Sequence, residues 1–433
     1  MSTSDSLGHQ IGRALNCRAV PHTVARSLSS DAAMYAGAKD APCPGTMGPM
    51  TRDGFRVAGL FAGVGGVELG LQRAGHKTEH LCESWGDARA VLQRRFSKVD
   101  LTDDVNDIRS LPDSIELVAA GFPCTDLSQA GRMAGIDGQA SGLVHVVLDL
   151  LDERRVPWLL IENVPHMLRL NGGRAMTVIT ERLEQLGYSW AYRIIDSRSF
   201  GLPQRRRRVF LLASQDEDPR LVLYRGDQGE PEAKIWKRTA YGFYWTEGNR
   251  GLGWAVDALP PLKGGTTANI PSPPAVWRPN SVIGRRIVTP SITAAEVAQG
   301  LPPGWTEDAP ERARWKLVGN AVSVPVSDWI GRGLREPAEP DSVDSLDLVP
   351  LDRSAAWPAA ACYVDKKRWA VQISEWPTQA PDRLHLGGLL QGYGCKPLSH
   401  RAARGFRDRL ARSSLRYDAR FMGDLSAHVD VSE

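Results

Sequence analysis

The chain has 433 residues, and 42% of them are hydrophobic. A chain of this length can bury a large core and is expected to form more than one domain. No apolar run reaches the length of a membrane span, and the start of the chain lacks the apolar segment of a secretory signal. We therefore expect a cytoplasmic protein without a membrane partner. The formal net charge of +3 is too small to identify a polyanionic partner.

Six cysteines are scattered along the chain without a C-x-x-C pair or a histidine at ligand spacing, at Cys17, Cys43, Cys82, Cys124, Cys362 and Cys395. This spacing supports neither a disulfide framework nor a zinc site, and we expect no bound metal. Arginine outnumbers lysine while alanine and glycine are abundant, which is typical of bacterial proteins from GC-rich genomes.

Residues 1–52 are rich in Ser, Ala, Gly and Arg without a sustained period, and we interpret them as a flexible leader. From Arg56 onward, short apolar runs alternate with amphipathic stretches, which predicts an α/β domain with a parallel sheet covered on both faces. Its first part spans residues 53–215. We expect strands over 56–61, 78–82, 115–120, 156–161 and 207–213, and helices over 67–74 and 176–186.

The alternation stops in residues 216–284, where Gly, Pro, Trp and Tyr are frequent, and we interpret this segment as a smaller, irregular domain. Residues 336–360 are acidic and Pro-rich, as expected of a linker. The extension 361–433 resumes with a strand over 368–373 and a basic helix near 401–416. That helix is a candidate accessory DNA contact, although a solvated amphipathic helix with Phe406 and Leu410 inward fits equally well.

A glycine turn follows the first predicted strand, in the segment Leu60-Phe61-Ala62-Gly63-Val64-Gly65-Gly66. Glycines let the backbone approach a ligand there, and the next helix presents unpaired N–H groups and the positive end of its dipole. A plain strand-to-helix connection would look the same. Glu68 stands where the nicotinamide dinucleotide fingerprint has its third glycine, which argues against a nicotinamide cofactor.

Acidic residues end the next two predicted β-α units. Glu83 ends the second strand, where a carboxylate can accept hydrogen bonds from ribose hydroxyls. On its own it would be a solvated surface acid, but together with the glycine turn it predicts an adenosine-type ligand. Asp104-Val105 ends the third unit and is a candidate for binding an adenine amino group, with Asp103 and Asp107 as alternatives.

The segment Gly121-Phe122-Pro123-Cys124 follows the apolar strand over 115–120. It therefore lies at the carboxyl end of the sheet, where open α/β sheets bind ligands. Free cysteines are commonly small buried hydrophobes. Here the polar residues that follow, Thr125, Asp126 and Ser128, favour a functional thiol instead.

Another strand delivers Glu162 to the same edge of the sheet. A carboxylate directly after a fully apolar strand is costly unless it is paired or functional. Further along, Gln204-Arg205-Arg206-Arg207-Arg208 runs into a strand. Because strand side chains alternate, Gln204, Arg206 and Arg208 should share one face while Arg205 and Arg207 point away. Taken alone, this cluster would be interpreted as a solvated charge run.

The whole set of segments resembles the DNA (cytosine-5) methyltransferases. The resemblance covers residues 56–331 and follows that family's order: Phe-Ala-Gly-x-Gly-Gly, an acid at the next strand, Gly-Phe-Pro-Cys, Glu-Asn-Val, Gln-x-Arg-x-Arg and Gly319-Asn320-Ala321-Val322. Each motif is short, but their ordered conjunction is highly specific. A weaker match runs from Thr289-Pro290 through Glu296 to Gln299-Gly300-Leu301-Pro302.

The resemblance implies a Rossmann-like domain that binds S-adenosylmethionine, with residues 216–284 as a target recognition domain and residues 285–335 returning to the catalytic domain. It implies methyl transfer to carbon 5 of cytosine in duplex DNA, after the base is flipped out of the helix. We expect a monomer, and a cognate restriction or phage-defence protein is a candidate partner.

The resemblance also assigns individual residues. It implies that Cys124 adds to carbon 6 of the ring, that Glu162 protonates or hydrogen-bonds ring N3, and that Arg206 and Arg208 orient the ring. Residues 125–142 would close over the base as a mobile lid. The implied cofactor contacts are Phe61, Gly63, Gly65, Gly66, Glu83, Ser84, Asp104, Val105, Pro123, Asn320 and Val322. The implied DNA contacts are Ser128 on a phosphate, Gln204, and Thr266 in the polar glycine loop 263–267.

Several positions depart from the family's pattern. Gly59 stands where the family often has Asp, Thr125 where it usually has Gln, and Ser141-Gly142 where Arg-Gly is common. Val297-Ala298 replaces the usual Arg-Leu before Gln299. Because none of these positions is the nucleophile or the acid, the departures bear on rate and target contacts more than on the type of reaction.

Two other functions fit parts of the pattern. One branch of this scaffold resembles enzymes that methylate cytosine in transfer RNA, but the long segment before Thr289 favours DNA, since a sequence-reading domain would otherwise be superfluous. A DNA-binding protein without turnover would keep the fold. The joint retention of Cys124, Glu162, Arg206 and Arg208 argues against that alternative.

Overall fold

The computed structural model describes residues 52–122, 142–245, 252–263 and 273–431. The chain separates into a unit of residues 1–50 and a unit of residues 51–433, and only the second contains described residues. The predicted leader, residues 1–52, thus lies almost entirely outside the described part. Within that part, no helix is both long and apolar enough to cross a membrane.

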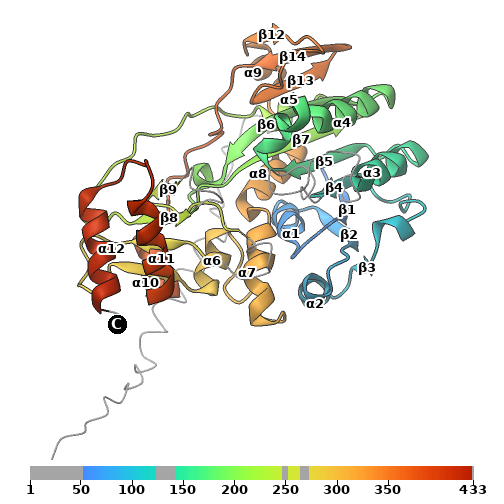
Figure 1. The fold of residues 1–433 in the computed structure, drawn as a ribbon. Coiled ribbons are helices and arrows are strands. Elements are labelled where there is room, and N and C mark those ends of the chain that lie inside the picture. Colours follow the sequence, from blue (N-terminus) through green and yellow to red (C-terminus); the bar gives the residue numbers. More distant parts are fainter. Residues whose placement is uncertain (1–51, 123–141, 246–251, 264–272, 432–433) are drawn as a thin grey trace, which may run out of the picture. The chain divides into compact units, whose positions relative to one another are not determined.

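A large mixed sheet runs through the second unit (Figure 1). Its parallel half has the order β5-β4-β1-β2-β3, and β7 and then β6 continue it antiparallel beside β5. This parallel half, with β1 at its centre, is the arrangement that the alternating sequence pattern predicts. The bounds are β1 Arg56–Leu60, β2 Lys77–Cys82, β3 Asp100–Thr102, β4 Leu117–Ala120, β5 Trp158–Asn163, β6 Ser189–Asp196 and β7 Arg207–Ser214.

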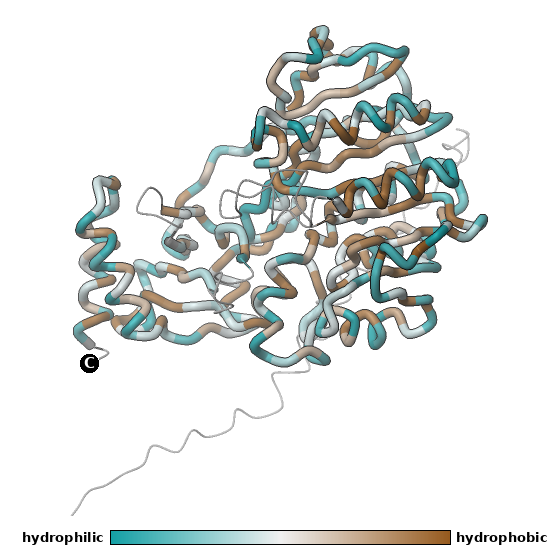
Figure 2. The backbone as a smooth tube through the Cα atoms, turned by 45° about the vertical axis from the view of Figure 1, so that its right-hand side comes forward, coloured by the Kyte–Doolittle hydropathy of each residue, from teal (hydrophilic) through white to brown (hydrophobic). Residues whose placement is uncertain are grey.

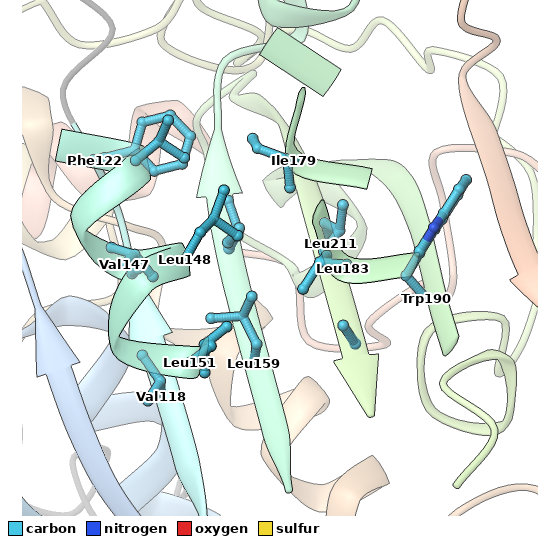
Figure 3. Close-up of a cluster of buried hydrophobic side chains, with 14 of the residues drawn as sticks. Val118, Phe122, Val147, Leu148, Leu151, Leu159, Ile179, Leu183, Trp190 and Leu211 are labelled. Atoms are coloured by element: carbon cyan, nitrogen blue, oxygen red, sulfur yellow. The ribbon is translucent and has the colours of Figure 1, made fainter. Parts of the chain in front are cut away.

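Helices cover both faces of this sheet, so its strands are apolar on both sides. Neighbouring residues of β1, Val57 and Ala58, belong to two different buried clusters. The cluster with Val57 includes α1 and α8, whereas the cluster with Ala58 includes α3 and α4. Figure 3 shows Leu148 and Leu183 of the latter helices close to Leu159 of β5. The helix bounds are α1 Gly66–Arg73, α3 Gly142–Glu153, α4 Arg174–Gln185 and α8 Val324–Arg335.

The five predicted strands are all present, with ends that differ by at most about two residues, as is usual at element boundaries. Strand β6 was not predicted. Arg193 interrupts the apolar pattern of this strand. A fully buried arginine is rare, so the pattern does not indicate a buried strand here. The guanidinium is accommodated by donating to the carbonyl oxygens of Leu223 at 3.0 Å and Ser374 at 2.5 Å. The other helices here are α2 Gly86–Arg95, α5 Arg220–Leu223, α6 Ile292–Ala298 and α7 Glu311–Asn320, with 3-10 turns η2 Val105–Asp107, η4 Pro165–Leu168, η5 Leu170–Gly173 and η6 Ser197–Phe200.

A second, antiparallel sheet has the strand order β15-β11-β10-β8-β9. Most of its strands come from the segment whose pattern is irregular. They have only three to five residues each, and one is supplied from near the C-terminus, so no local period marks this sheet. The bounds are β8 Tyr241–Trp245, β9 Leu252–Val256, β10 Ala275–Trp277, β11 Ile287–Pro290 and β15 Cys395–Pro397.

The segment 336–360, which has the composition of a linker, contributes structure to the main sheet. It contains α9 (Pro340–Asp344) and β12 (Leu348–Pro350), and the following β13 (Ala360–Val364) pairs with β6. Strand β14 (Lys367–Val371) lies between β13 and β12. An unpaired sheet edge is a template for further pairing, and the edge of β6 is closed in this way. Composition alone therefore misidentifies the segment as a connector.

The extension 361–433 contributes strands to both sheets, and its C-terminal helices pack against the second sheet. Phe406 and Phe421 form a buried cluster with Phe243 of β8 and Trp277 of β10, with the Phe421 ring 5.0 Å from that of Phe243 and 5.3 Å from that of Trp277. Figure 2 shows hydrophobic and hydrophilic positions alternating along helices, as one buried face requires. The bounds are α10 Leu386–Tyr393, α11 His400–Ala411 and α12 Ala419–Val431.

Replacing Phe421 tests whether the C-terminal helices belong to this core. Phe421→Ala should lower the free energy of unfolding of the full chain by about 3 to 5 kcal/mol, because it empties a fully buried ring site. Denaturant unfolding measures the change. Tyr417, just before α12, is 43% exposed and is the matched control. Tyr417→Ala should change the free energy by less than about 0.5 kcal/mol, and equal effects would contradict the packing described.

Candidate active site

The glycine turn between β1 and α1 has a left-handed backbone at three positions, with φ of 57° at Phe61, 57° at Gly63 and 78° at Gly65. Such angles strain any residue other than glycine, and the strain at Phe61 is of the kind that clusters at functional sites. A side chain at Gly66 would meet the carbonyl oxygen of Val322 at 2.6 Å. Around Gly63, by contrast, no atom of the described residues lies within 4 Å of an added Cβ. The turn therefore leaves room for a ligand against its backbone.

Glu83 joins the end of β2 to this turn. Its Oε2 accepts a hydrogen bond from the backbone N–H of Gly63 at 2.7 Å, and its Oε1 accepts one from Trp85 at 2.8 Å. These bonds fix the carboxylate, while each oxygen retains a further acceptor position for a ligand hydroxyl. Trp85 is a further residue at this site that was not predicted, and its half-buried ring has the Lys316 ammonium 4.7 Å from its centroid. The signal in the sequence that could have identified Trp85 is its position two residues after Glu83, the acid that follows β2.

The acids after β3 have distinct roles in the structure. The Oδ1 of Asp104 accepts a hydrogen bond from the backbone N–H of Asn106 at 2.9 Å and so caps η2, whose Val105 is buried. Asp103 lies 3.3 Å from the guanidinium of Arg89. Ser84, next to Glu83, is exposed. Asp104 is thus held at the carboxyl ends of the strands, while Asp103 is already engaged in an ion pair.

Glu162 and Arg208 form an ion pair at the end of β5. The Nε of Arg208 lies 3.0 Å from the Oε1 of Glu162, and both side chains are largely buried. The two groups are not aligned as a hydrogen bond, so within the described residues Oε1 has no hydrogen-bond partner. The pair forms because β7 runs antiparallel to β5, with Phe210 opposite Glu162. Arg208, two residues before Phe210 on β7, then reaches the carboxylate.

The hydrogen-bond partners of Arg206 are backbone carbonyl groups of a segment distant in the sequence. Its buried guanidinium donates to the carbonyl oxygens of Gly319 at 3.1 Å and Ala321 at 2.8 Å. Burial lowers the pKa of Arg206 well below its usual value, the neighbouring Arg208 lowers it further, and Glu162 opposes both. Because the segment after α7 covers this side chain, we correct the expectation that Arg206 contacts the substrate ring. It anchors the segment 319–322 instead.

Gln204 also requires a correction. Its side chain is fully buried, with Nε2 donating to the carbonyl oxygen of Ala298 at 3.0 Å and Oε1 accepting from the backbone N–H of Leu262 at 3.2 Å. It therefore has no surface for the expected DNA contact. Its alternation with the arginines was predicted, but its partners come from distant loops that a local pattern does not reveal.

Two residues of the weaker sequence match have similar framework roles. Gln299 donates from Nε2 to the carbonyl oxygen of Val318 at 2.9 Å and accepts at Oε1 from the Ser323 hydroxyl at 3.0 Å. Glu296 accepts hydrogen bonds from the backbone of Gly304 and Thr306. These bonds flank the segment that carries Asn320, which is exposed, and Val322, whose carbonyl meets Gly66. The last motif is thereby brought against the glycine turn.

Four predicted site residues lie outside the described part of the chain: Pro123, Cys124, Ser128 and Thr266. The chain leading to Cys124 is described as far as Phe122. At Gly121, an added Cβ would lie 3.9 Å from Glu162 Oε2 and 3.9 Å from the Phe61 carbonyl oxygen. The end of β4 therefore lies beside both the buried carboxylate and the glycine turn, which is the edge that the sequence predicted.

Two other cysteines are unsuited to act as nucleophiles. Burial raises the pKa of Cys82 to about 12, with Glu83 as the next cause, and burial also raises the pKa of Cys362 to about 12. Both therefore remain thiols at neutral pH. The described residues contain no cluster of three or more potential metal ligands.

Glu68, in the first turn of α1, occupies the space above Gly59. A Cβ at position 59 would come within 2.1 Å of the Glu68 Oε1, so the glycine makes room for this carboxyl group. Glu68 is 1% exposed, and its Oε2 has no hydrogen-bond partner among the described residues. Burial raises the pKa of Glu68 to about 7, a backbone hydrogen bond opposes the rise, and Glu83 adds to it. The family often has an aspartate at position 59, and in this chain the glycine at that position leaves space for the buried acid Glu68.

The chain matches the family model described as C-5 cytosine-specific DNA methylase over residues 55–240. It is 47% identical to Type II methyltransferase M2.BsuMI of Bacillus subtilis (strain 168), across 87% of this chain and 98% of that protein. It is 26% identical to Type II methyltransferase M.NgoBI of Neisseria gonorrhoeae, across 63% of this chain and 90% of that protein. A crystal structure of S. pombe Dnmt2 methyltransferase aligns with 64% of this chain and 97% of that chain, at 14% identity and a TM-score of 0.47.

The raised pKa of Glu68 predicts a pH-dependent stability. The folded chain binds this proton more tightly than the unfolded chain, so the contribution of Glu68 to stability falls as pH rises from the ordinary value of 4.5 to about 7 and does not change above that. Glu68→Gln removes this titration. Its stability relative to the native chain should therefore rise by about 3 kcal/mol between pH 4.5 and pH 8.

Denaturant unfolding of both chains across this pH range measures the difference. Glu153→Gln, at an exposed helical position, is the control and should follow the native chain within about 0.5 kcal/mol. A stability difference for Glu68→Gln that does not vary with pH would contradict the assignment.

Proposed function

Because the chain belongs to the C-5 cytosine-specific DNA methylase family, we propose that it transfers a methyl group from S-adenosylmethionine to carbon 5 of cytosine in a specific duplex DNA sequence. The observation that carries this proposal is the paired, buried carboxylate of Glu162, which lies beside Gly121 at the end of β4. Cys124 follows Gly121 by three residues, so it is within about 11 Å of it along the chain.

The residues around the glycine turn suit an adenosine-type ligand. Space beside Gly63 that no described residue fills, the fixed carboxylate of Glu83 and the capped Asp104 lie at the carboxyl ends of β1, β2 and β3. We assign the backbone at Phe61, Gly63, Gly65 and Gly66 to the methionine part of the ligand. Glu83 and Ser84 are assigned to the ribose, Asp104 and Val105 to the adenine, and Pro123, Asn320 and Val322 to the remaining wall. Bound S-adenosylmethionine supplies an electrophilic methyl group on its sulfonium.

Cys124 is the proposed nucleophile. An unperturbed thiol is a few per cent ionised near neutral pH, so forming the thiolate costs only about 2 kcal/mol. The thiolate sulfur bonds to carbon 6 of the cytosine, and the electron pair of the C5–C6 double bond becomes available at carbon 5. Carbon 5 would use this pair to take the methyl group, with the electron pair of the broken S–CH3 bond left on the sulfur of the donor, and a base then takes the proton of carbon 5. The C5–C6 double bond re-forms as the C6–S bond breaks and releases the thiolate.

Glu162 is the proposed acid at ring N3. Negative charge develops on the ring as sulfur adds, and a proton or hydrogen bond at N3 stabilises that charge in a site shielded from water. Arg208 holds the Glu162 carboxyl group and is the arginine that we assign to the ring oxygen. Arg206 supports the site indirectly, since it fixes the segment that follows α7.

The target base must leave the duplex to reach these groups, at a cost of a few kcal/mol. We propose that residues 125–142 close over it, with Ser128 on a phosphate, and that the polar glycine loop with Thr266 contributes to sequence recognition in the major groove. These residues lie outside the described part of the chain, so their roles rest on the sequence resemblance. The proposed biological setting is restriction–modification or a related defence system, with a cognate restriction or defence protein as partner and the enzyme acting as a cytoplasmic monomer.

Bisulfite sequencing of DNA from a host that expresses the full chain tests this function. The native chain should protect cytosines within one recurring sequence. Cys124→Ala should abolish the protection while the variant still binds DNA, because only the nucleophile is removed. Methylation by Cys124→Ala at the native level would falsify the nucleophile, and incorporation of methyl groups into transfer RNA rather than duplex DNA would overturn the substrate.

A further inference from the structure

The four arginines that lead into β7 and begin it have different partners. Arg206 donates to backbone carbonyls, Arg207 forms an ion pair with Glu375, and Arg208 pairs with Glu162. Arg205 differs from the other three. Its side chain is half-buried, and the described part of the chain offers its guanidinium neither a hydrogen bond nor an ion pair. The run thus leaves one cation available to a ligand.

A second cation lies in the same region. The Nζ of Lys263 is 4.4 Å from the centroid of the Tyr244 ring, within the range of a cation–π contact. The ring in turn lies against Gly253, where an added Cβ would come within 2.4 Å of it. The backbone N–H of Arg205 donates to the carbonyl oxygen of Leu259, four residues before Lys263, and Arg205 also opposes the rise that burial causes in the pKa of Tyr244. Arg205, Tyr244 and Lys263 therefore form one cluster.

The backbone holds this cluster in a fixed position relative to the catalytic acid. The backbone N–H of Arg205 donates to the carbonyl oxygen of Leu259 at 2.8 Å, which fixes the approach of residues 259–263 to the arginine run. Arg205 precedes Arg208 by three residues, about 10 Å along an extended chain. Lys263 is the last described residue before 264–272, the segment that contains the proposed recognition residue Thr266. The cluster thus lies between the Glu162–Arg208 ion pair and the last residue described before that segment.

We propose that Arg205 and Lys263, spaced by the Tyr244 ring, bind a backbone phosphate of duplex DNA next to the flipped nucleotide. This inference rests on the proposed function and adds a binding site to it. A nucleotide turned into the pocket leaves its flanking phosphates outside, within several ångströms of the catalytic groups. The Arg205 guanidinium offers a fork of N–H donors to phosphate oxygens, and the Lys263 ammonium adds a point charge. Tyr244 holds the lysine in place.

Binding of labelled duplex DNA to the full chain as a function of salt tests the proposal. Each lost phosphate contact should reduce the slope of log affinity against log salt by about 0.9 and weaken binding about fivefold near 150 mM salt. We expect the double variant to lose this full amount, and Arg205→Ala and Lys263→Ala to lose about half of it each, equally with target and random sequences. Arg205→Lys should recover most of the slope, which also shows that the site tolerates substitution.

Arg207→Ala is the matched control, since it removes a neighbouring arginine whose charge is already engaged by Glu375. Its salt slope should equal that of the native chain. A native slope in Arg205→Ala, or an equal loss in Arg207→Ala, would overturn the phosphate contact while leaving the proposed function intact. Salt-independent or absent duplex binding by the native chain would overturn the proposed function together with this inference.

Discussion

The candidate site depends on keeping one carboxylate at the end of an apolar strand. Every residue of β5 is buried, and a charged group in such a place is stable only with a partner. Arg208 is that partner, and it reaches Glu162 only because β7 lies antiparallel to β5 in this register. Their contact is an ion pair without hydrogen-bond alignment, which leaves an oxygen of Glu162 able to bind something else. The strand order of the sheet is therefore a requirement of the chemistry.

Several motif residues maintain the frame around this pair. Arg206 and Gln204 are buried and satisfy backbone groups of segments about 90 to 115 residues away in the sequence. Through Arg206 the segment after α7 is held near Glu162, and through the contact of Val322 with Gly66 it also meets the glycine turn. A position whose side chain only supports the site can thus require one particular residue type as strictly as a catalytic position does.

The sequence predicted the features that depend on local pattern. The apolar run of β4, the glycine turn and the carboxylate near the end of β5 were identified because each has a short-range signature. The division of labour between Arg206 and Arg208 was not, since alternation puts both on one face and only distant carbonyl oxygens separate their roles. The second sheet was missed for a similar reason. Its strand β15 lies more than 100 residues from its partner β11, so the pairing leaves no local pattern.

The coupling between Glu162 and Arg208 is measured most directly by a double-mutant cycle on single-turnover methyl transfer to duplex DNA. The variants are Glu162→Gln, Arg208→Gln and the combination. If the two residues act as one unit, each single substitution lowers the rate by about 100-fold or more, and the double variant is no slower than the slower single variant. Losses that multiply in the double variant would show that the pair acts independently and would contradict the central role of this ion pair.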